Sequence, residues 1–310
     1  MDASDLRVFE SVARTGGMNR AAAALNTVQS NVTARVRALE AELGTPLFDR
    51  HSRGVALTAA GQRLLPYAAK VARLLDDAAR ATRDDGTPSG TLTVGTLETT
   101  AALRLAEPLA RFARDWPSVD LVVRTGTTAE LIDMVLERRV EGAFVCGPVD
   151  HPELREEPTF REELAVFSGR DLTSLDALAG QRDLKLIVLR AGCSYRQRLE
   201  HVLARRGVVS TRLLEFGTLE AIFNCVAAGI GITLLPRQLA GSVWSASRVA
   251  VHPLPPTEAM VRTVFIRRRD AFVSSALSAF VAAASAAPER LSATRKRANA
   301  SAIVAMPNGR

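Results

Sequence analysis

Apolar side chains recur every three or four residues through the first 83 residues of the chain, the spacing that places them on one face of a helix. This pattern predicts four helices, over residues 4–14, 20–25, 28–43 and 59–83. The third shows it most clearly, with an apolar face made of Val32, Val36, Leu39 and Leu43. After residue 90 the pattern changes to short apolar runs that alternate with helical segments, which is typical of an α/β domain.

Capping residues mark the starts of these helices. Ser4, Asn19, Thr27 and Thr58 stand at the four starts, where a short polar side chain can accept a hydrogen bond from a free N–H of the first turn. Asn26 interrupts the alanine-rich second helix. Helices two and three are therefore expected to form a helix-turn-helix.

The third helix carries small and polar side chains opposite Val32, with an arginine at the rim. These residues are Gln29, Ser30, Thr33, Ala34 and Arg37. Such a helix fits a DNA major groove, where Gln, Ser and Thr bond base edges and Arg takes phosphate. Apolar spacing alone favours an ordinary helical hairpin in a core.

A basic turn follows the third helix. Leu47 and Phe48 are expected to fill the core, and residues 50–54, which include Arg50 and Arg53, are expected to form a basic turn between two short extended pieces. This is the composition of a wing that grips the phosphate backbone beside the groove. The alternative is a solvated surface turn.

The fourth helix, 59–83, is long for one with no domain of its own around it, so we expect it to pair with a partner helix. Its apolar stripe consists of Leu64, Ala68, Val71, Leu75 and Ala78, widened by Leu65, Ala72 and Leu74. Pro66 should kink it locally, because proline removes one backbone donor. The segment 84–90, DDGTPSG, reads as a hinge.

The pattern after residue 90 predicts two α/β lobes. One consists of about residues 91–162 together with 261–287, and the other of about residues 163–260. Strands are expected over 91–97, 119–125, 142–146, 164–168, 185–190, 211–216, 231–235 and 261–266. Helices are expected over 100–114, 128–139, 195–206, 219–228 and 271–287. Two such lobes enclose a cleft that can trap a ligand. The basic tail 288–310 lacks periodicity and is expected to be disordered.

Charge and composition narrow the choice of function. The net charge of +7 is inflated by the tail, whereas the segment 14–63 holds seven arginines against three acidic residues. Three distant cysteines, scattered histidines and the polar start MDASD indicate a cytoplasmic protein with no disulfide framework, metal site, signal peptide or membrane span. Neither a GxSxG nor a GxxxxGK motif occurs, so an enzyme is not favoured and no cofactor is expected. An exported solute receptor would need a signal peptide, and the polar N-terminus and the attached helix-turn-helix argue against one.

The first sixty residues resemble a known family. The segment from Asp5 to Gly61, DLRVFESVARTGGMNRAAAALNTVQSNVTARVRALEAELGTPLFDRHSRGVALTAAG, is similar to the N-terminal segment of LysR-type transcriptional regulators. The coarser architecture matches over 1–287, and LNTVQSNVTARV with GTLETTAA looks most like the branch of sarcosine-oxidase-operon regulators. Asn19 stands where the family usually has Ser, and Thr33 where Ser is common.

The resemblance implies a winged helix-turn-helix, a linker helix that pairs two chains, and a two-lobed effector domain like periplasmic binding proteins. It also implies tetramers on inverted-repeat DNA sites, and a small inducer that alters the DNA bend and the contact with RNA polymerase. The candidate DNA-contacting residues are Asn19, Thr27, Gln29, Ser30, Asn31, Thr33, Ala34, Arg35, Arg37, Arg50 and Arg53.

Four loops that follow predicted strands are candidates for effector contact, since helix N-termini there offer free N–H groups to an anion. They comprise Leu97, Glu98, Thr99 and Thr100; Gly126, Thr127 and Thr128; Gly192, Cys193 and Ser194; and Gly217 and Thr218. Their hydroxyls can donate to a carboxylate and accept from an amine. The alternative is that these residues merely cap helices.

Two of these residues suggest a chemistry. Glu98 could pair with an amine-bearing effector, or with Arg196 or Arg198 and have no other role. Cys193 precedes a helix, whose dipole lowers a thiol pKa, and resembles the reactive cysteine of the family's peroxide sensor. That sensor has a second cysteine shortly downstream, whereas here Cys225 is the nearest candidate. Thiol redox sensing is therefore the alternative to ligand sensing.

Overall fold

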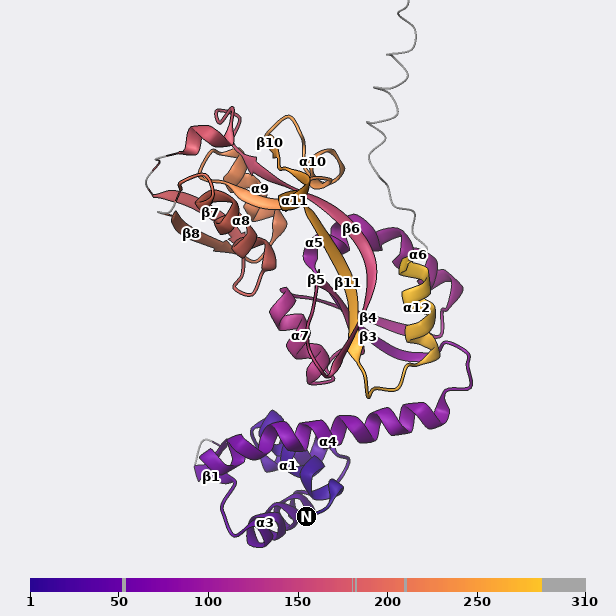
Figure 1. Ribbon diagram of the computed structural model, residues 1–310. Coiled ribbons are helices and arrows are strands. Elements are labelled where there is room, and N and C mark those ends of the chain that lie inside the picture. The colour runs from indigo at the N-terminus through magenta and orange to yellow at the C-terminus, as the bar shows by residue number, and fades with distance from the viewer. Residues whose placement is uncertain (52–53, 180, 182, 209–210, 286–310) are drawn as a thin grey trace, which may run out of the picture.

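The computed structural model describes residues 1–51, 54–179, 181, 183–208 and 211–285. A small helical domain and a larger two-lobed domain are joined by one long helix, which runs beneath the larger domain in Figure 1. The predicted wing residue Arg53, the last two residues of the predicted final helix and the predicted disordered tail lie outside the described residues.

The N-terminal domain has three helices, α1 (Ala3–Thr15), α2 (Met18–Ala24) and α3 (Gln29–Leu43), and a hairpin of strands β1 (Phe48–His51) and β2 (Gly54–Leu57). The sequence predicted all of these elements. Phe9 packs on Phe48 with ring centroids 5.2 Å apart, and Val32, Val36 and Leu39 are buried beside them. The hairpin is therefore fixed to the same core as the helices, as expected for a wing.

The capping predictions for these helices were wrong. Asp2 caps α1 in a reciprocal pair with Asp5, and Gly17 precedes α2 so that Asn19 lies inside its first turn. Gly16 ends α1 in the left-handed conformation, with φ 68°, and α2 begins directly after Gly17, two residues before its predicted start. Val28 is the N-cap residue of α3, so Thr27 lies one residue too early to cap the helix. Its side chain instead accepts a hydrogen bond from Asn31 Nδ2 at 3.0 Å.

Helix α4 (Ala59–Arg83) begins where predicted, with Thr58 Oγ1 accepting a hydrogen bond from the N–H of Gly61 at 3.1 Å. A Cβ at Gly61 would lie 2.2 Å from the carbonyl oxygen of Leu47, so only glycine allows this close approach. The helix runs through Pro66 and packs part of its apolar stripe on the N-terminal core. Its remaining large apolar side chains, Tyr67, Leu74 and Leu75, are exposed.

The larger domain is built on a sheet with the strand order β10-β6-β11-β5-β3-β4, with β9 paired to β6. Strands β3 (Gly90–Thr96), β4 (Val119–Thr125) and β5 (Gly142–Gly147) are parallel and form the predicted βαβαβ unit. Strands β6 (Leu154–Ser168) and β11 (Met260–Arg268) are antiparallel and run from one lobe to the other, as Figure 1 shows.

The second lobe contains strands β7 (Leu184–Leu189), β8 (Thr211–Phe216), β9 (Thr233–Pro236) and β10 (Ala250–Pro253). Its longer helices are α8 (Ser194–Ala204) and α9 (Leu219–Ala227), and the short helices η2 (Leu175–Leu178), α10 (Leu239–Ser242) and α11 (Pro256–Ala259) complete it. Strand β10 was not predicted. Trp244 fills the core of this lobe against Phe167 and Phe223.

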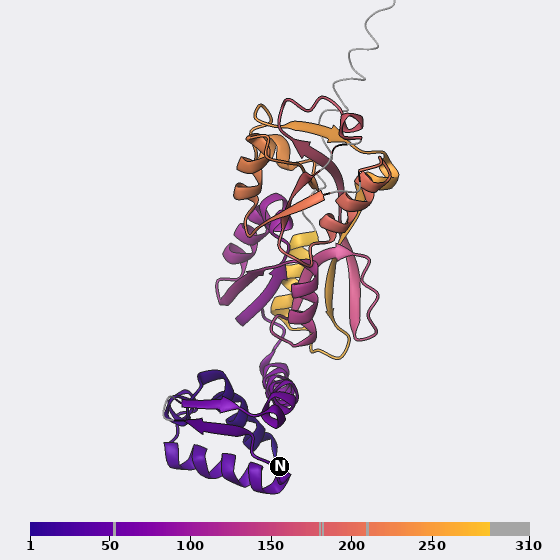
Figure 2. The same ribbon diagram turned by 90° about the vertical axis from the view of Figure 1, so that its left-hand side faces the viewer.

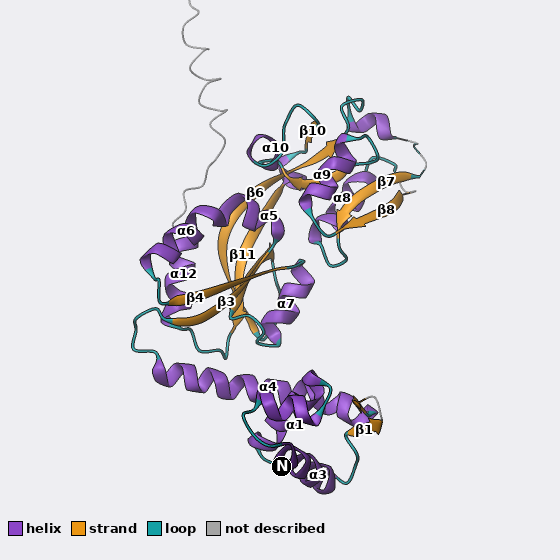
Figure 3. Ribbon diagram, turned by 180° about the vertical axis from the view of Figure 1, so that it is seen from behind, coloured by secondary structure: helices purple, strands orange, loops and turns teal. Residues whose placement is uncertain are grey.

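Three helices of the first lobe also differ from prediction. The helix expected over 100–114 consists of α5 (Glu98–Thr100), the π-helical turn η1 (Ala101–Leu105) and α6 (Ala106–Asp115). Helix α7 (Thr128–Leu136) ends three residues before the predicted end. Helix α12 (Ser275–Ser285) begins four residues after the predicted start at 271. It lies beside α6, as seen from behind in Figure 3, and Phe280 meets Phe112 edge to face at 5.5 Å.

Candidate functional site

The polar face of α3 is free to contact a ligand. Gln29, Ser30, Asn31, Ala34 and Arg37 are exposed, and α3 lies at the free end of the N-terminal domain in Figure 2. Thr33 is half-buried, and its hydroxyl accepts a hydrogen bond from Gln29 Nε2 at 3.3 Å. The opposite face of the helix is anchored in the core, so this polar face is held rigidly. Leu43, predicted on the buried face, is 38% exposed because it is the last residue of the helix.

Arg35 has an internal partner as well. Its Nη1 donates to Asp5 Oδ1 at 2.9 Å, which ties α3 to α1. Arg50 lies in β1 opposite Val55 in the hairpin register. The structure thus leaves Gln29, Ser30, Ala34 and Arg37 exposed on α3, whereas Arg35 is engaged within the domain.

A cavity of about 30 Å³ lies between the two lobes. Loops after β3, β4, β7 and β8 meet there, because the carboxyl ends of parallel strands point to the same edge of a sheet. The lining residues are Leu97, Glu98, Thr99, Thr125, Gly126, Thr127, Leu189, Arg190, Cys193, Tyr195 and Gly217. The cavity has room for about one water molecule, which is far smaller than the roughly 300–1,000 Å³ of ordinary ligand pockets.

Seven of the twelve predicted effector residues line this cavity, and five do not. Thr128 Oγ1 accepts a hydrogen bond from the N–H of Cys146 at 3.4 Å, and Thr218 Oγ1 caps α9 through the N–H of Ala221 at 3.3 Å. Ser194 lines a separate surface hollow behind α8. Thr100 and Gly192 also lie outside the cavity lining. Thr218 therefore acts as a helix cap, which was the alternative to effector contact.

Four lining residues were missed, Thr125, Leu189, Arg190 and Tyr195. Each directly precedes or follows a predicted loop or strand end. Extending each candidate loop by one residue would have found Thr125 and Tyr195. Arg190 was placed inside a predicted strand, but β7 ends at Leu189 and leaves the arginine exposed at the cavity.

A hydrogen bond closes the cleft between the lobes. Glu98 of the first lobe accepts at Oε1 from the backbone N–H of Leu219, the first residue of α9 in the second lobe, at 3.0 Å. The alternative partner Arg196 is engaged elsewhere, with Glu200 and Glu215 at 3.1 Å each. The carboxylate of Glu98 thus sits at a helix N-terminus, where free N–H groups favour a negative charge.

Two buried hydroxyls at the cavity have no hydrogen-bond partner among the described residues. They are Thr99 Oγ1 and Tyr195 Oη, on side chains that are 1% and 4% exposed. Burial raises the pKa of Tyr195 well above its usual value and the Glu162 charge adds to the effect, whereas the neighbouring Thr99 hydroxyl acts in the opposite direction. The two hydroxyls are thus neighbours that lack a well-formed hydrogen bond to any described residue. A buried hydroxyl without a partner costs about 1–3 kcal/mol, so a ligand group that pairs with it gains binding energy.

The thiol of Cys193 is not activated. Burial raises its pKa, although the backbone N–H groups of Tyr195 and Arg196 act in the opposite direction. The expectation of a lowered pKa was therefore wrong, because desolvation outweighs the helix terminus. Burial likewise raises the pKa of Cys146.

A buried ion pair joins elements of the first lobe near the cleft. Arg104 Nε lies 3.3 Å from Glu162 Oε1, with both side chains less than a tenth exposed. Burial raises the pKa of Glu162, and Arg104 opposes this shift. Within the described ranges, no group of His, Cys, Asp and Glu is arranged to hold a metal ion, and no helix is both long and apolar enough to span a bilayer.

A winged helix-turn-helix followed by a two-lobed domain with a cleft defines a class of DNA-binding proteins that carry a ligand-binding domain. Two family descriptions match the chain, "Bacterial regulatory helix-turn-helix protein, lysR family" over residues 3–62 and "LysR substrate binding domain" over residues 85–288. The chain belongs to the LysR family of DNA-binding transcriptional regulators.

Two relatives agree with this assignment. The chain is 44% identical over 281 residues to the uncharacterized HTH-type transcriptional regulator YusT of Bacillus subtilis, covering 91% of this chain and 94% of the relative. It is 41% identical over 276 residues to the regulator GltR of the same organism, covering 89% and 93%.

Its fold is similar to that of full-length OxyR from Pseudomonas aeruginosa, with a TM-score of 0.67, 21% identity and coverage of 93% of this chain and 95% of that one. It is also similar to CbnR in complex with its target DNA, with a TM-score of 0.64, 23% identity and coverage of 92% and 99%. The resemblance to the sarcosine-oxidase-operon branch stays a prediction.

Proposed function

We propose that this regulator is controlled by a small amine or amino-acid-like effector that binds between the two lobes. The observation that carries this proposal is the set of polar groups at one cavity. The Glu98 carboxylate suits an ammonium group, Arg190 suits a carboxylate, and the unpaired hydroxyls of Thr99 and Tyr195 suit either. Leu97, Gly126, Thr127, Cys193 and Gly217 complete the proposed site.

The small size of the cavity sets a condition on binding. An effector larger than water requires the lobes to separate, which breaks the hydrogen bond between Glu98 and Leu219. The ammonium group then replaces the backbone N–H as the partner of Glu98. Effector binding and lobe opening are thereby linked through one side chain.

A thermal-shift screen of the full-length protein tests this proposal. The compounds are amino acids, N-methylated amines, other amines, simple carboxylates and peroxide. A ligand at one hundred times its Kd adds about 2.7 kcal/mol to the free energy of unfolding, which is readily detected. A hit among amine-bearing compounds supports the proposal, and a screen in which only carboxylates bind contradicts it.

Thiol sensing through Cys193 is the competing mode. The raised pKa of this buried thiol counts against it, because the thiolate is the reactive form. A peroxide response that Cys193→Ser abolishes, with no response to any amine, would favour thiol sensing.

On the DNA side, we propose that α3 enters the major groove. Gln29, Ser30, Asn31, Thr33 and Ala34 would face base edges, while Arg37 takes phosphate. Asn19, Thr27, Arg35 and the wing residues Arg50 and Arg53 complete the proposed interface. Arg53→Ala should weaken binding to all sequences alike and lower the salt dependence; a change in preferred bases would contradict the wing role.

We further propose that α4 pairs with the same helix of a second copy. Three large side chains of α4 form an apolar face that the described part of the chain leaves uncovered. They are Tyr67, Leu74 and Leu75, which are 69%, 52% and 43% exposed. Two paired chains would present two α3 helices to an inverted-repeat promoter site. Two such dimers would form a tetramer that contacts RNA polymerase. Sedimentation of Leu74→Glu should show dissociation, with exposed Arg83→Glu as the control.

A further inference from the structure

We infer that helix α7 couples the effector cleft to the linker helix α4, because its first turn borders the cleft and the residues that follow its last turn hold α4 through Asp77. This inference deepens the proposed function, since it rests on the cleft between the lobes being the effector site.

The first turn of α7 is part of the cleft. Thr127 lines the cavity and caps the helix in a reciprocal pair with Glu130, whose side chain accepts from the N–H of Thr127 at 2.8 Å. The second lobe rests directly on this turn: the N–H of Ala129 donates to the carbonyl of Gly192 at 3.5 Å. A Cβ at Gly192 would lie 2.8 Å from Thr127 Oγ1, so lobe movement must displace this contact.

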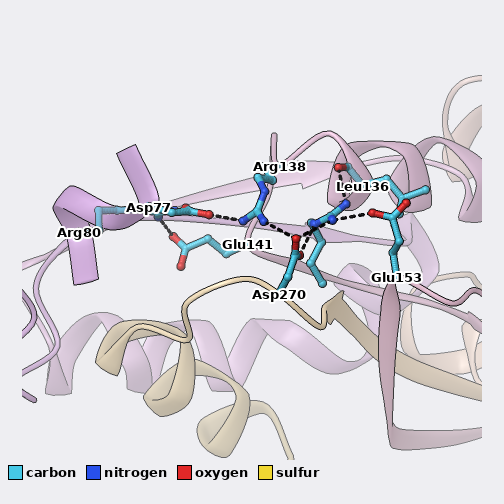
Figure 4. Close-up of polar contacts among 8 residues, drawn as sticks. Asp77, Arg80, Leu136, Arg138, Glu141, Glu153 and Asp270 are labelled. Atoms are coloured by element: carbon cyan, nitrogen blue, oxygen red, sulfur yellow. Dashed lines mark hydrogen bonds and ion pairs between the residues drawn. The ribbon is translucent and has the colours of Figure 1, made fainter. Parts of the chain in front are cut away.

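The other end of α7 carries the contact with α4. Helix α7 ends at Leu136, and Arg138 follows with φ 57°, a conformation uncommon for a residue with a side chain. The Arg138 side chain is 6% exposed, and its guanidinium forms ion pairs with Asp77 of α4 and, at 2.9 Å, with Asp270. Figure 4 shows Arg138 between these two carboxylates.

Arg268 supports this end of α7 from the neighbouring strand β11. It donates to the carbonyl of Leu136 at 3.0 Å and pairs with Asp270 at 2.7 Å and Glu153 at 2.6 Å. The hydrogen bond from Arg268, together with the charges of Arg138 and Arg268, lowers the pKa of Asp270 to about 2, so this carboxylate stays charged beside Arg138. The end of the helix is therefore fixed from two sides.

Helix α4 meets the first lobe along one line of its surface. Asp77, Arg80 and Asp84 are spaced by three and four residues and share one face. Arg80 pairs with Glu141, which also accepts from Ser274 Oγ at 3.1 Å, and Asp84 accepts from the N–H of Ser275 at 2.6 Å. These contacts fix the direction of α4 relative to the lobe.

The arrangement has the properties of a mechanical link. Helix α7 has nine residues, about 14 Å of rigid hydrogen-bonded rod. Asp77 is only 8% exposed and is held by Arg138 at one carboxylate oxygen and by Arg80 of its own helix, at 2.5 Å, at the other. Loss of the Arg138 contact leaves half of this buried carboxylate without its partner, which is unfavourable. Displacement of the first turn by an opening cleft therefore biases whether the other end holds α4.

Amide hydrogen exchange of the full-length protein tests this coupling without ligand or DNA. The probes are the N–H groups of Ala129 and Glu130, which bond to Gly192 and Thr127 at the cleft. Asp77→Asn, at the opposite end of α7, should raise their exchange rates at least about fivefold. The matched control is Asp76→Asn, which alters the adjacent, exposed aspartate of the same helix and should leave the rates unchanged.

A second variant completes the experiment. Arg138→Gln removes the other partner of the Asp77–Arg138 ion pair and should raise the same rates. Asp77→Asn also loses the pair with Arg80, and Arg138→Gln the pair with Asp270, so the double variant should raise the rates by less than the sum of the two single effects, because the Asp77–Arg138 contact is lost only once. If Asp77→Asn does not fold, Arg138→Gln carries the test. The inference is overturned if the rates change equally in the Asp76→Asn control, or if they change in neither Asp77→Asn nor Arg138→Gln.

The outcome separates this inference from the proposed effector. If exchange is faster in Asp77→Asn and Arg138→Gln but the thermal-shift screen gives no hits, then the ends of α7 are coupled and the proposed effector class is wrong. Unchanged exchange together with a hit among the amines means that the effector binds but α7 does not transmit it.

Discussion

The Glu98 carboxylate accepts a hydrogen bond from the N–H of Leu219 at 3.0 Å, which joins the two lobes across the cavity. Glu98→Gln keeps an oxygen that can accept this bond, so the fold and the closed cleft should persist. A hydrogen bond to a charged group is roughly twice as strong as a neutral one, so the variant should bind an amine-bearing effector at least about tenfold more weakly. Titration calorimetry measures this change.

A matched control uses another acidic residue in the first turn of a helix in this lobe. Glu130→Gln alters a carboxylate that caps α7 and does not line the cavity. Effector affinity that falls equally in both variants would assign the effect to the fold of the cleft rather than to the Glu98 charge.

The hydroxyl of Tyr195 is buried without a partner among the described residues, so its removal should separate folding from binding. Tyr195→Phe should leave the free energy of unfolding unchanged or raise it by about 1 kcal/mol, and should weaken effector binding. Denaturant unfolding and calorimetry measure the two quantities. Tyr67→Phe, at the other tyrosine of the chain, is the control because Tyr67 is 69% exposed on α4. A clear loss of stability in Tyr195→Phe would show that the hydroxyl is paired in solution.

Elements defined by local pattern could be predicted well from the sequence. Strands β4 and β8 have the predicted bounds, and Thr58 caps α4, because alternation and capping depend on residues close together in the chain. Strand β6 was predicted only over its last five residues. Its first half carries the charged segment REEPTFREE, whose exposed side chains hide the alternation, with Pro158 at an irregularity in the pairing.

Features that depend on distant residues could not be predicted. Arg138 and Asp77 are separated by 61 residues, and no local pattern indicates that they meet. The cleft loops were located because each follows a strand and precedes a helix. Which of their side chains reach the cavity depends on how the lobes close, so Tyr195 and Arg190 were missed and Thr218 was included.

Replacements on α3 should divide into two kinds of effect on DNA binding. Ser30→Ala or Thr33→Val should weaken binding to the preferred site by about 1–3 kcal/mol and relax the choice of bases. Arg37→Ala should weaken binding to all sequences alike and reduce the slope of log K against log salt by about 1. Fluorescence anisotropy with selected and scrambled duplexes, at several salt concentrations, measures both. Loss of base preference in Arg37→Ala would place this arginine at a base edge instead.

The pH dependence of stability should contain a contribution from His252. The side chain is 8% exposed in β10, its Nε2 shares a hydrogen bond with Ser168 Oγ at 2.8 Å, and burial lowers its pKa below the usual 6.5. The unfolded chain therefore binds the proton more readily, so the contribution is complete above about pH 6.5 and is lost as the pH falls through the lower folded pKa. His252→Gln should flatten the stability curve between about pH 7 and 5, because Gln can still bond to Ser168 but does not titrate. The curve comes from urea unfolding at each pH, with exposed His201→Gln as the control. An unchanged slope in His252→Gln would mean that this histidine is protonated equally easily in the folded and unfolded states.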